Sequence, residues 1–262
     1  MAAWQIGDVR VDRIVEFERP LLPASQLYPA STPEAIDRHR AWLEPWLLER
    51  ESGLLRIAFH SDLVRSKGLK ILVDTCSGND RQRPGKPRYH MQKWPYLENL
   101  AAAGVAPEEI DYVLCTHLHV DHVGWNTRRV DGRWVPTFPN ARYLFDRAEW
   151  GYWERHYRTE AFRDDPYYLD CIHPVLEAGL ADYVESGYVF NDEVWLDPTP
   201  GHTPGHVCVH VRSRGRECVM SGDLMHHAVQ CAEPDWSRPS YRWRDVPDTY
   251  NHAIGFRCAK TP

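Results

Sequence analysis

The sequence predicts an α/β sandwich rather than a regular series of βαβ units. Short apolar, β-branched runs alternate irregularly with segments of helical pattern, and no internal repeat or low-complexity segment is present. The run 112–115 leads directly into a cluster of His and Asp, and the runs 207–212 and 217–220 are followed by turns that carry Gly or Asp. Polar side chains at several strand ends indicate a site built at one edge of the sheets.

The composition and charge are those of an ordinary globular protein. The chain has 262 residues, of which 43% are hydrophobic and 26% charged, and this length allows one large domain or two small ones. A net charge of −6, with no Lys/Arg run longer than two, argues against a nucleic-acid partner. Seven cysteines without a C-x-x-C pair predict reduced thiols. With no signal-peptide pattern and no apolar run of membrane-spanning length, we expect a cytoplasmic protein without a membrane partner.

The first third of the chain predicts two pairs of strands and one helix. Residues 5–17 alternate as a β-hairpin does, and the apolar runs 54–64 and 69–74 predict a second strand pair. Between the two pairs, the segment Ser31–Glu34 predicts a helix start, with a hydroxyl cap and a proline in the first turn. Pro45 is expected to break or kink this helix.

The remaining elements follow from similar patterns. The polar segment 79–93, rich in Pro and Arg, predicts an exposed loop at the rim of a site. Residues 95–104 predict a short helix closed by glycine, and 112–115 predict a buried strand. A strand over 141–145 is expected to lead into a helix that begins near Asp146. Further strands are predicted at 189–196, 207–212 and 217–220.

The strongest chemical signal is the run His117-x-His119-x-Asp121-His122. Residues two apart on a strand face the same side, so His117 and His119 can bind one metal ion. If the chain turns after His119, Asp121 and His122 can face a second ion nearby. Imidazole nitrogen and carboxylate oxygen suit Zn²⁺, with Fe or Mn as alternatives. The alternative interpretation of the run is a solvated loop that is rich in His and binds no metal.

Two further motifs add candidate ligands. In the segment 198–206, prolines and glycines predict a tight turn that would hold His202 as a ligand, while His206 is expected to be structural. Ser221-Gly222-Asp223 follows a predicted strand, so Asp223 could bridge two metal ions or simply be a turn aspartate. Together the three motifs are much stronger evidence than any one of them.

These motifs, in this order and spacing, resemble those of the metallo-β-lactamase superfamily. Val73-Asp74-Thr75 is similar to that family's upstream strand-end motif, and the resemblance covers about residues 1–235. The extended runs 116–126 and 222–227 are most similar to the branch of lactonases and methyl-parathion-hydrolase-like enzymes.

The resemblance implies a four-layer αββα sandwich with two zinc ions at one edge. It implies a first zinc on His117, His119 and His202, a second on Asp121 and His122, and Asp223 as the bridge between them. Asp74 would orient one of the ligand imidazoles.

The implied activity is hydrolysis of a small ester, lactone or related acyl or phosphotriester substrate by a zinc-activated hydroxide. Asp121 would orient the nucleophile or relay its proton. Homoserine lactonases of this fold carry a tyrosine shortly after the bridging aspartate; here the same stretch holds His226 and His227, and His226 is the candidate general acid. Cys115 is expected to be structural. The alternatives are a glyoxalase-II-like thioester hydrolase, and a protein that binds metal but is catalytically impaired.

The last residues depart from the family pattern. The segments 237–244 and 254–259 resemble the tail of a formylglycine-generating (sulfatase-modifying) enzyme domain, so we divide the chain into a hydrolase domain, 1–235, and an atypical tail, 236–262. The fold is therefore expected to lack its usual final strand and helix. A further family histidine would be missing unless His252 replaces it, which predicts a weak second zinc site. An uncovered sheet edge would favour a homodimer.

Overall fold

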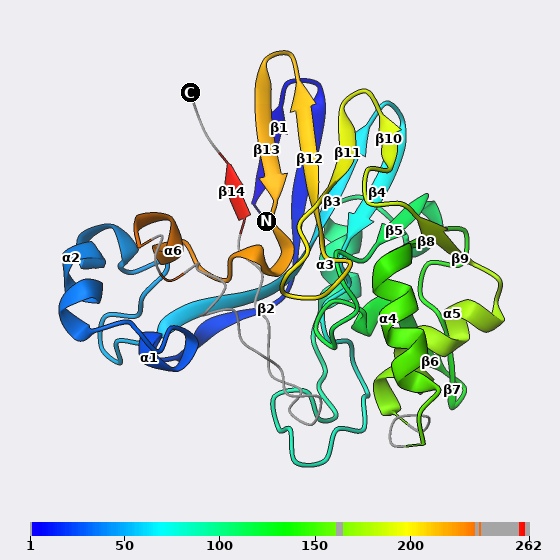
Figure 1. The fold of residues 1–262 in the computed structure, drawn as a ribbon, viewed down its shortest axis with the longest axis horizontal. Helices are drawn as coiled ribbons and strands as arrows, with labels where there is room; N and C mark the ends of the chain where they lie inside the picture. The colour runs from blue at the N-terminus through cyan, green and yellow to red at the C-terminus, as the bar shows by residue number, and fades with distance from the viewer. Residues whose placement is uncertain (1, 161–164, 234–235, 237–256, 260–262) are drawn as a thin grey trace.

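Two β-sheets packed face to face form the body of the molecule (Figure 1). The computed structural model describes residues 2–160, 165–233 and 236, together with the backbone of 257–259. The larger sheet has the spatial order β1 (Ala3–Ile6), β2 (Val9–Leu22), β3 (Leu55–Ser66), β4 (Leu69–Val73), β5 (Tyr112–Leu114), β8 (Arg142–Asp146) and β9 (Ala181–Val184). The smaller sheet has the order β10 (Val189–Asn191), β11 (Val194–Pro198), β12 (Val207–Ser213), β13 (Arg216–Met220) and β14 (Arg257–Ala259). A separate hairpin pairs β6 (Thr127–Val130) with β7 (Arg133–Pro136).

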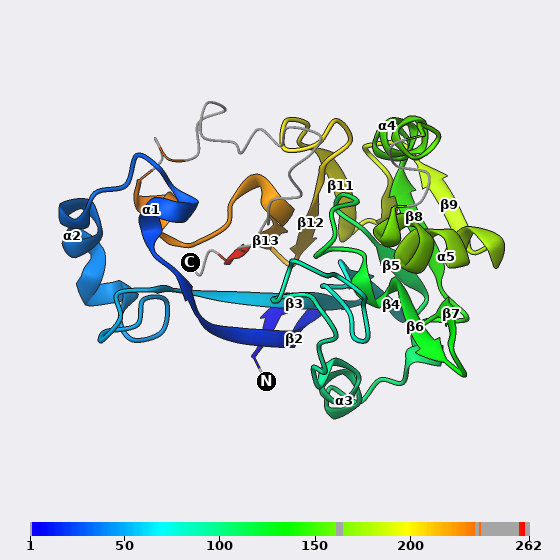
Figure 2. The ribbon, with the colours of Figure 1, turned by 90° about the horizontal axis from the view of Figure 1, so that it is seen from below.

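Short helices connect the strands. Helix α3 (Tyr96–Ala102) lies on the face of the larger sheet that points away from the smaller sheet (Figure 2). The other helical segments are α1 (Ala24–Leu27), α2 (Pro33–Leu43), η1 (Pro107–Glu109), η2 (Gly124–Asn126), α4 (Arg147–Tyr157), η3 (Tyr168–Ile172), α5 (His173–Glu177), η4 (Gly222–Leu224) and α6 (Val229–Ala232). In the described part of the chain, none of them has the length and apolarity that a membrane crossing requires.

The larger sheet changes from antiparallel to parallel pairing at β4. Strands β1 to β4 pair antiparallel, whereas β4, β5, β8 and β9 run parallel, so their carboxyl ends meet at one edge. At this edge the Val207 amide, which begins β12, donates a hydrogen bond of 3.0 Å to the carbonyl oxygen of Thr116, just after β5. The two sheets are therefore joined where their strand ends come together.

Two apolar clusters stabilise this arrangement. One lies between the sheets and combines side chains of the larger sheet, such as Val73 and Leu114, with side chains of the smaller sheet, such as Val209 and Met220. The other fills the opposite face of the larger sheet and includes Tyr96 and residues of α4 and α5. Because alternate residues of a strand face opposite sides, the larger sheet is apolar on both faces. The α/β sandwich predicted from the sequence is confirmed.

Most of the predicted elements are present with small changes of boundary. Thr32 caps α2, since its hydroxyl accepts a hydrogen bond from the Ala35 amide, and α2 ends just before Pro45. β3 and β4 form the predicted strand pair. At the end of β8, Asp146 caps α4 by accepting hydrogen bonds from the amides of Ala148 and Glu149.

Two predictions were wrong in detail. Residues 189–196 form two strands rather than one, because the Asn191 side chain accepts hydrogen bonds from the amides of Glu193 and Val194 and turns the chain between β10 and β11. The segment 79–93 forms neither helix nor strand, as predicted, but it is not simply exposed. Arg83 is buried and makes a two-pronged ion pair with Asp170, which fixes part of this loop against η3.

The end of the chain supplies a final strand. β14 pairs antiparallel with Cys218–Met220 of β13, so the expectation that the fold lacks its last strand, leaving this edge uncovered, is wrong. The argument for a homodimer loses this support. The rest of the predicted atypical tail, including His252, lies outside the described residues.

Candidate metal centre

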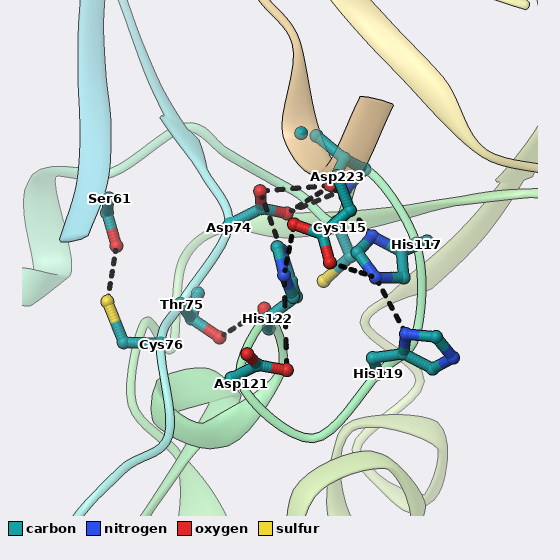
Figure 3. Close-up of polar contacts among 12 residues, drawn as sticks. Ser61, Asp74, Thr75, Cys76, Cys115, His117, His119, Asp121, His122 and Asp223 are labelled. Carbon is teal, nitrogen blue, oxygen red and sulfur yellow. Dashed lines mark hydrogen bonds and ion pairs between the residues drawn. The ribbon is translucent and has the colours of Figure 1, made fainter. Parts of the chain in front are cut away.

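The predicted ligands meet at the edge where the strand ends converge. Asp74 follows β4, and the run 117–122 follows β5. His202 lies in the turn between β11 and β12, and Asp223 lies in η4, directly after β13. Residues more than 100 positions apart in the chain are therefore placed around one point, and Figure 3 shows several of these side chains pointing toward one another.

Four ligand atoms form the tightest group. His119 Nδ1 lies 3.0 Å from His117 Nε2 and 2.9 Å from His202 Nε2. Asp223 Oδ2 lies 3.6 Å from His117 Nε2 and 3.2 Å from His202 Nε2. One ligand atom from each of these residues lies within 4.8 Å of the others. Burial lowers the pKa of both His117 and His119 well below the usual value, so their imidazoles are neutral and offer lone pairs to a cation.

A second group shares the Asp223 carboxylate. His122 Nε2 lies 3.3 Å from Asp223 Oδ1 and 4.0 Å from Asp121 Oδ1. Both carboxylate oxygens of Asp121 are buried, and neither has a hydrogen-bond partner within the described residues. Buried carboxylates without donors are rare, and burial raises the pKa of Asp121 to about 8, so a cation beside it would favour the ionised form. Imidazole nitrogen and carboxylate oxygen are donors that suit zinc.

Asp74 holds the second group in place. Its Oδ2 lies 3.0 Å from His122 Nδ1, on the side of the ring opposite the ligand atom. The backbone amide of Thr116 donates to Asp74 Oδ1 at 2.7 Å, and the Thr116 hydroxyl lies 3.0 Å from both carboxylate oxygens. Asp74 itself has a left-handed backbone, with φ of 59°, a conformation that is uncommon for residues other than glycine. The geometry matches the orienting role expected for Asp74.

His206 supports Asp223 from behind. His206 Nε2 accepts a hydrogen bond of 3.0 Å from the Asp223 amide, and its Nδ1 lies 2.8 Å from the Thr199 hydroxyl. Burial lowers the pKa of His206 to about 3, so the ring is neutral and can accept from one side while donating from the other. A Cβ on Gly222, whose φ is +48°, would lie 2.7 Å from His206 Nε2, so this turn requires glycine.

The two histidines that follow η4 are separated by the fold. His226 Nε2 lies 3.7 Å from Asp223 Oδ2, and its ring centroid lies 5.9 Å from that of His202. His227 points away, and its Nε2 lies 3.0 Å from the Leu47 carbonyl oxygen. On the sequence alone, either residue could be a general acid. In the structure, only the side chain of His226 lies at the metal centre.

His227 is expected to make the fold sensitive to acid. Burial lowers its pKa from 6.5 to about 4. The unfolded chain therefore binds a proton at this residue between about pH 6.5 and pH 4 while the folded chain does not, and stability falls as pH drops through this range, by about 3 kcal/mol at most. Chemical denaturation at pH 7 and pH 4.5 should show this loss in the wild type and a smaller loss in His227→Gln. Equal losses in the two proteins would contradict the prediction.

Two residues of α4 beside the metal centre were not predicted from the sequence. Glu149 is buried, and its carboxylate accepts hydrogen bonds from the amide of Leu118, between two ligands, and from the amide of Gly205, close to a third. The Trp153 ring lies edge-to-face against His119, with centroids 5.7 Å apart. The spacing of Asp146 and Glu149 is a signal in the sequence, but it is typical of a helix cap and would predict a local role for Glu149.

Cys115 has the structural surroundings expected for it. Its side chain is buried at the end of β5 beside the Asn126 side chain, and burial raises the pKa of its thiol well above the usual value. A thiol in this state is a poor nucleophile. Cys115 is therefore no candidate nucleophile. The groups at the site that could carry chemistry are one or two bound cations and the adjacent side chains of Asp121 and His226.

Comparison with known proteins finds similarity to one superfamily of metal-dependent enzymes. A model of the metallo-β-lactamase superfamily matches residues 61–253. An N-acyl homoserine lactonase of Bacillus cereus is 35% identical over 107 residues, which cover 41% of this chain but only 35% of that protein. The N-acyl homoserine lactonase AiiA of Bacillus thuringiensis subsp. kurstaki is 26% identical over 205 residues, covering 77% of this chain and 70% of AiiA. The structure of AidC, a dizinc quorum-quenching lactonase, is similar in fold, with a TM-score of 0.64 at 18% identity, covering 92% of this chain and 82% of AidC.

Proposed function

Because this chain belongs to the metallo-β-lactamase superfamily, we propose that it is a zinc-dependent hydrolase of small lactones and related esters. The observation that carries the proposal is the convergence of the ligand atoms of His117, His119, His202 and Asp223 within 4.8 Å. The N-acyl homoserine lactonases among its relatives support a lactone as the substrate class. Within the superfamily, we assign the chain to the branch of lactonases and methyl-parathion-hydrolase-like enzymes.

The chain's own residues fit two zinc ions. His117, His119 and His202 would hold the first ion, Asp121 and His122 the second, and the two oxygens of Asp223 face both groups. Zinc bound by such ligands supplies Lewis acidity and allows water to ionise near neutral pH.

Protein side chains carry out the two proton transfers of the reaction. Asp121, with both carboxylate oxygens free of hydrogen-bond donors in the described structure, orients the attacking water and accepts its proton at an Oδ atom. When the C–O bond of the ester or lactone breaks, the leaving alkoxide needs a proton. His226, whose Nε2 lies 3.7 Å from Asp223 Oδ2, donates it. His226 belongs to the stretch 224–227, which corresponds to the stretch where homoserine lactonases of this fold carry a tyrosine.

A substrate panel tests the proposed activity. Hydrolysis of a homoserine lactone, a p-nitrophenyl ester, a phosphotriester and a thioester is measured in zinc-loaded protein and in metal-free protein. We expect the lactone or the ester to be hydrolysed fastest, and only with metal. Preference for the thioester would favour the glyoxalase-II-like alternative, and no turnover of any substrate would identify a metal-binding protein that is catalytically impaired.

Zinc is expected to leave the protein in two steps. The first site has three histidines and a carboxylate in a tight group, whereas the described residues give the second site two carboxylates and one histidine. Fewer ligands should make the second zinc weaker by at least about tenfold. Zinc per chain, measured by mass spectrometry after dialysis at increasing chelator concentration, should show a plateau at one ion. Loss of both ions together would contradict this prediction.

We also propose that the chain consists of a hydrolase domain, 1–235, and an atypical tail, 236–262, whose β14 adds a strand to the smaller sheet of that domain. The support is the resemblance of 237–244 and 254–259 to the tail of a formylglycine-generating enzyme domain. Sequencing the genomic locus downstream tests it, since an uninterrupted family-type ending encoded there would identify the tail as a fusion or a frameshift. A homodimer stays a prediction that light scattering can test.

A further inference from the structure

Glu149 joins two ligand-bearing loops that are far apart in sequence. Its Oε1 accepts a hydrogen bond of 3.0 Å from the Leu118 amide, which lies between His117 and His119. Its Oε2 accepts a hydrogen bond of 3.0 Å from the Gly205 amide, three residues after His202. One carboxylate therefore holds the backbone on both sides of the first group of ligands.

Burial raises the pKa of Glu149, and the hydrogen bonds that its carboxylate accepts oppose this by stabilising the ionised form. The Trp153 indole N–H also donates to Glu149 Oε1, at 2.7 Å, so donors approach both oxygens. Glu149 is only 1% exposed, and a buried charge is costly unless it is hydrogen-bonded in this way. A glutamine here could accept at one side only, because its NH₂ group would face an N–H at the other side.

The contact with the second loop is fixed by close packing. A Cβ on Gly205 would lie 2.2 Å from the Glu149 backbone nitrogen, so the 198–206 turn approaches the start of α4 as closely as glycine allows. Asp146 caps the same helix end through the amides of Ala148 and Glu149. Glu149 therefore projects from a helix end that is itself held in place, and it does not fold back on the cap.

We propose that Glu149 is a positioning residue that aligns His117 and His119 with His202 before metal binds. The inference rests on the proposed zinc site, because its benefit is to reduce the ordering that zinc binding would otherwise require. Glu149 is not expected to touch substrate. Its effect is on the affinity of the first metal site and on the order of the two loops without metal.

The test compares Glu149→Gln with Glu154→Gln, an identical change on a half-exposed residue of the same helix that pairs with Arg158. Zinc affinity is measured by competition with a chromophoric chelator, starting from metal-free protein. We expect zinc at the tight site to bind roughly 10- to 100-fold more weakly in Glu149→Gln and unchanged, within about threefold, in Glu154→Gln. Equal zinc affinities in the two variants would overturn the proposal.

Amide hydrogen exchange of the metal-free wild type gives an independent answer, even if Glu149→Gln does not fold. The amides of Leu118 and Gly205 should be protected from exchange without zinc, and in a folded Glu149→Gln protein they should exchange at least about tenfold faster. Exchange at the rate of exposed loop amides in the wild type would overturn the proposal. This measurement involves neither zinc nor substrate, so it separates failure of this inference from failure of the proposed hydrolase function.

Discussion

Replacing His119 with alanine is expected to lower kcat/KM by at least about 10³-fold and to weaken the tight zinc by at least about 100-fold. His119 Nδ1 lies within 3.0 Å of the ligand nitrogens of both His117 and His202, at the centre of the first group. Without it, two imidazoles and a shared carboxylate remain, so the first zinc would lose one of its four protein ligands. Steady-state kinetics at saturating zinc and a chelator competition measure the two effects.

The matched control is His173→Ala. His173 is half-exposed on α5 and pairs with Glu177, so removing it should leave both zinc content and kcat/KM within about twofold of the wild type. Thermal unfolding of the metal-free proteins distinguishes loss of the ligand from loss of the fold. Full activity in His119→Ala with zinc still bound would place the chemistry at another site.

The candidate ligands were predictable because each follows a strand or a rigid turn. The position of the run 117–122 directly after a buried strand indicates that its side chains lie at a sheet edge. Asp223 after β13 and His202 in a Pro-Gly turn carry the same kind of local signal. The parallel strands β4 and β5 bring their carboxyl ends to one edge, so local patterns predict that Asp74 and the run 117–122 lie together. His202 and Asp223 come from the antiparallel smaller sheet, and only the packing of the two sheets brings them to the same edge.

The supporting residues were not predictable in this way. Glu149 accepts hydrogen bonds from the backbone amides of Leu118 and Gly205. Every residue type except proline has such an amide, so the identities of these two residues do not predict the contact. The burial of Arg83 in a polar loop depends on Asp170, which lies 87 positions away. Such pairs are set by tertiary packing, and composition alone assigns them to the surface.

The choice between His226 and His227 also depends on tertiary structure. Neighbouring residues in an extended or turning segment point in different directions, and the sequence does not say which one faces the metal centre. In the structure, His227 Nε2 lies within hydrogen-bond distance of the Leu47 carbonyl oxygen, whereas His226 Nε2 lies beside Asp223.

Replacing His226 with phenylalanine is expected to lower kcat for a lactone by about 10²-fold or more, with KM changed by less than about threefold. The leaving group of a lactone is a strongly basic alkoxide, and it needs the proton that His226 Nε2 would donate. The same variant should lose less than about threefold on a p-nitrophenyl ester, because that leaving group departs without protonation. Steady-state kinetics on the two substrates give the ratio directly.

The unequal losses distinguish catalysis from support of the site. If His226 only packed against His202 or held Asp223 in position, both substrates would depend on it equally, since both need the same metal centre. His226→Tyr provides the conservative comparison, because a phenol is also a proton donor, as in the lactonases of this fold. It should retain at least about a tenth of the wild-type lactone rate. Equal losses on the two substrates, with no recovery in His226→Tyr, would assign the proton to another donor.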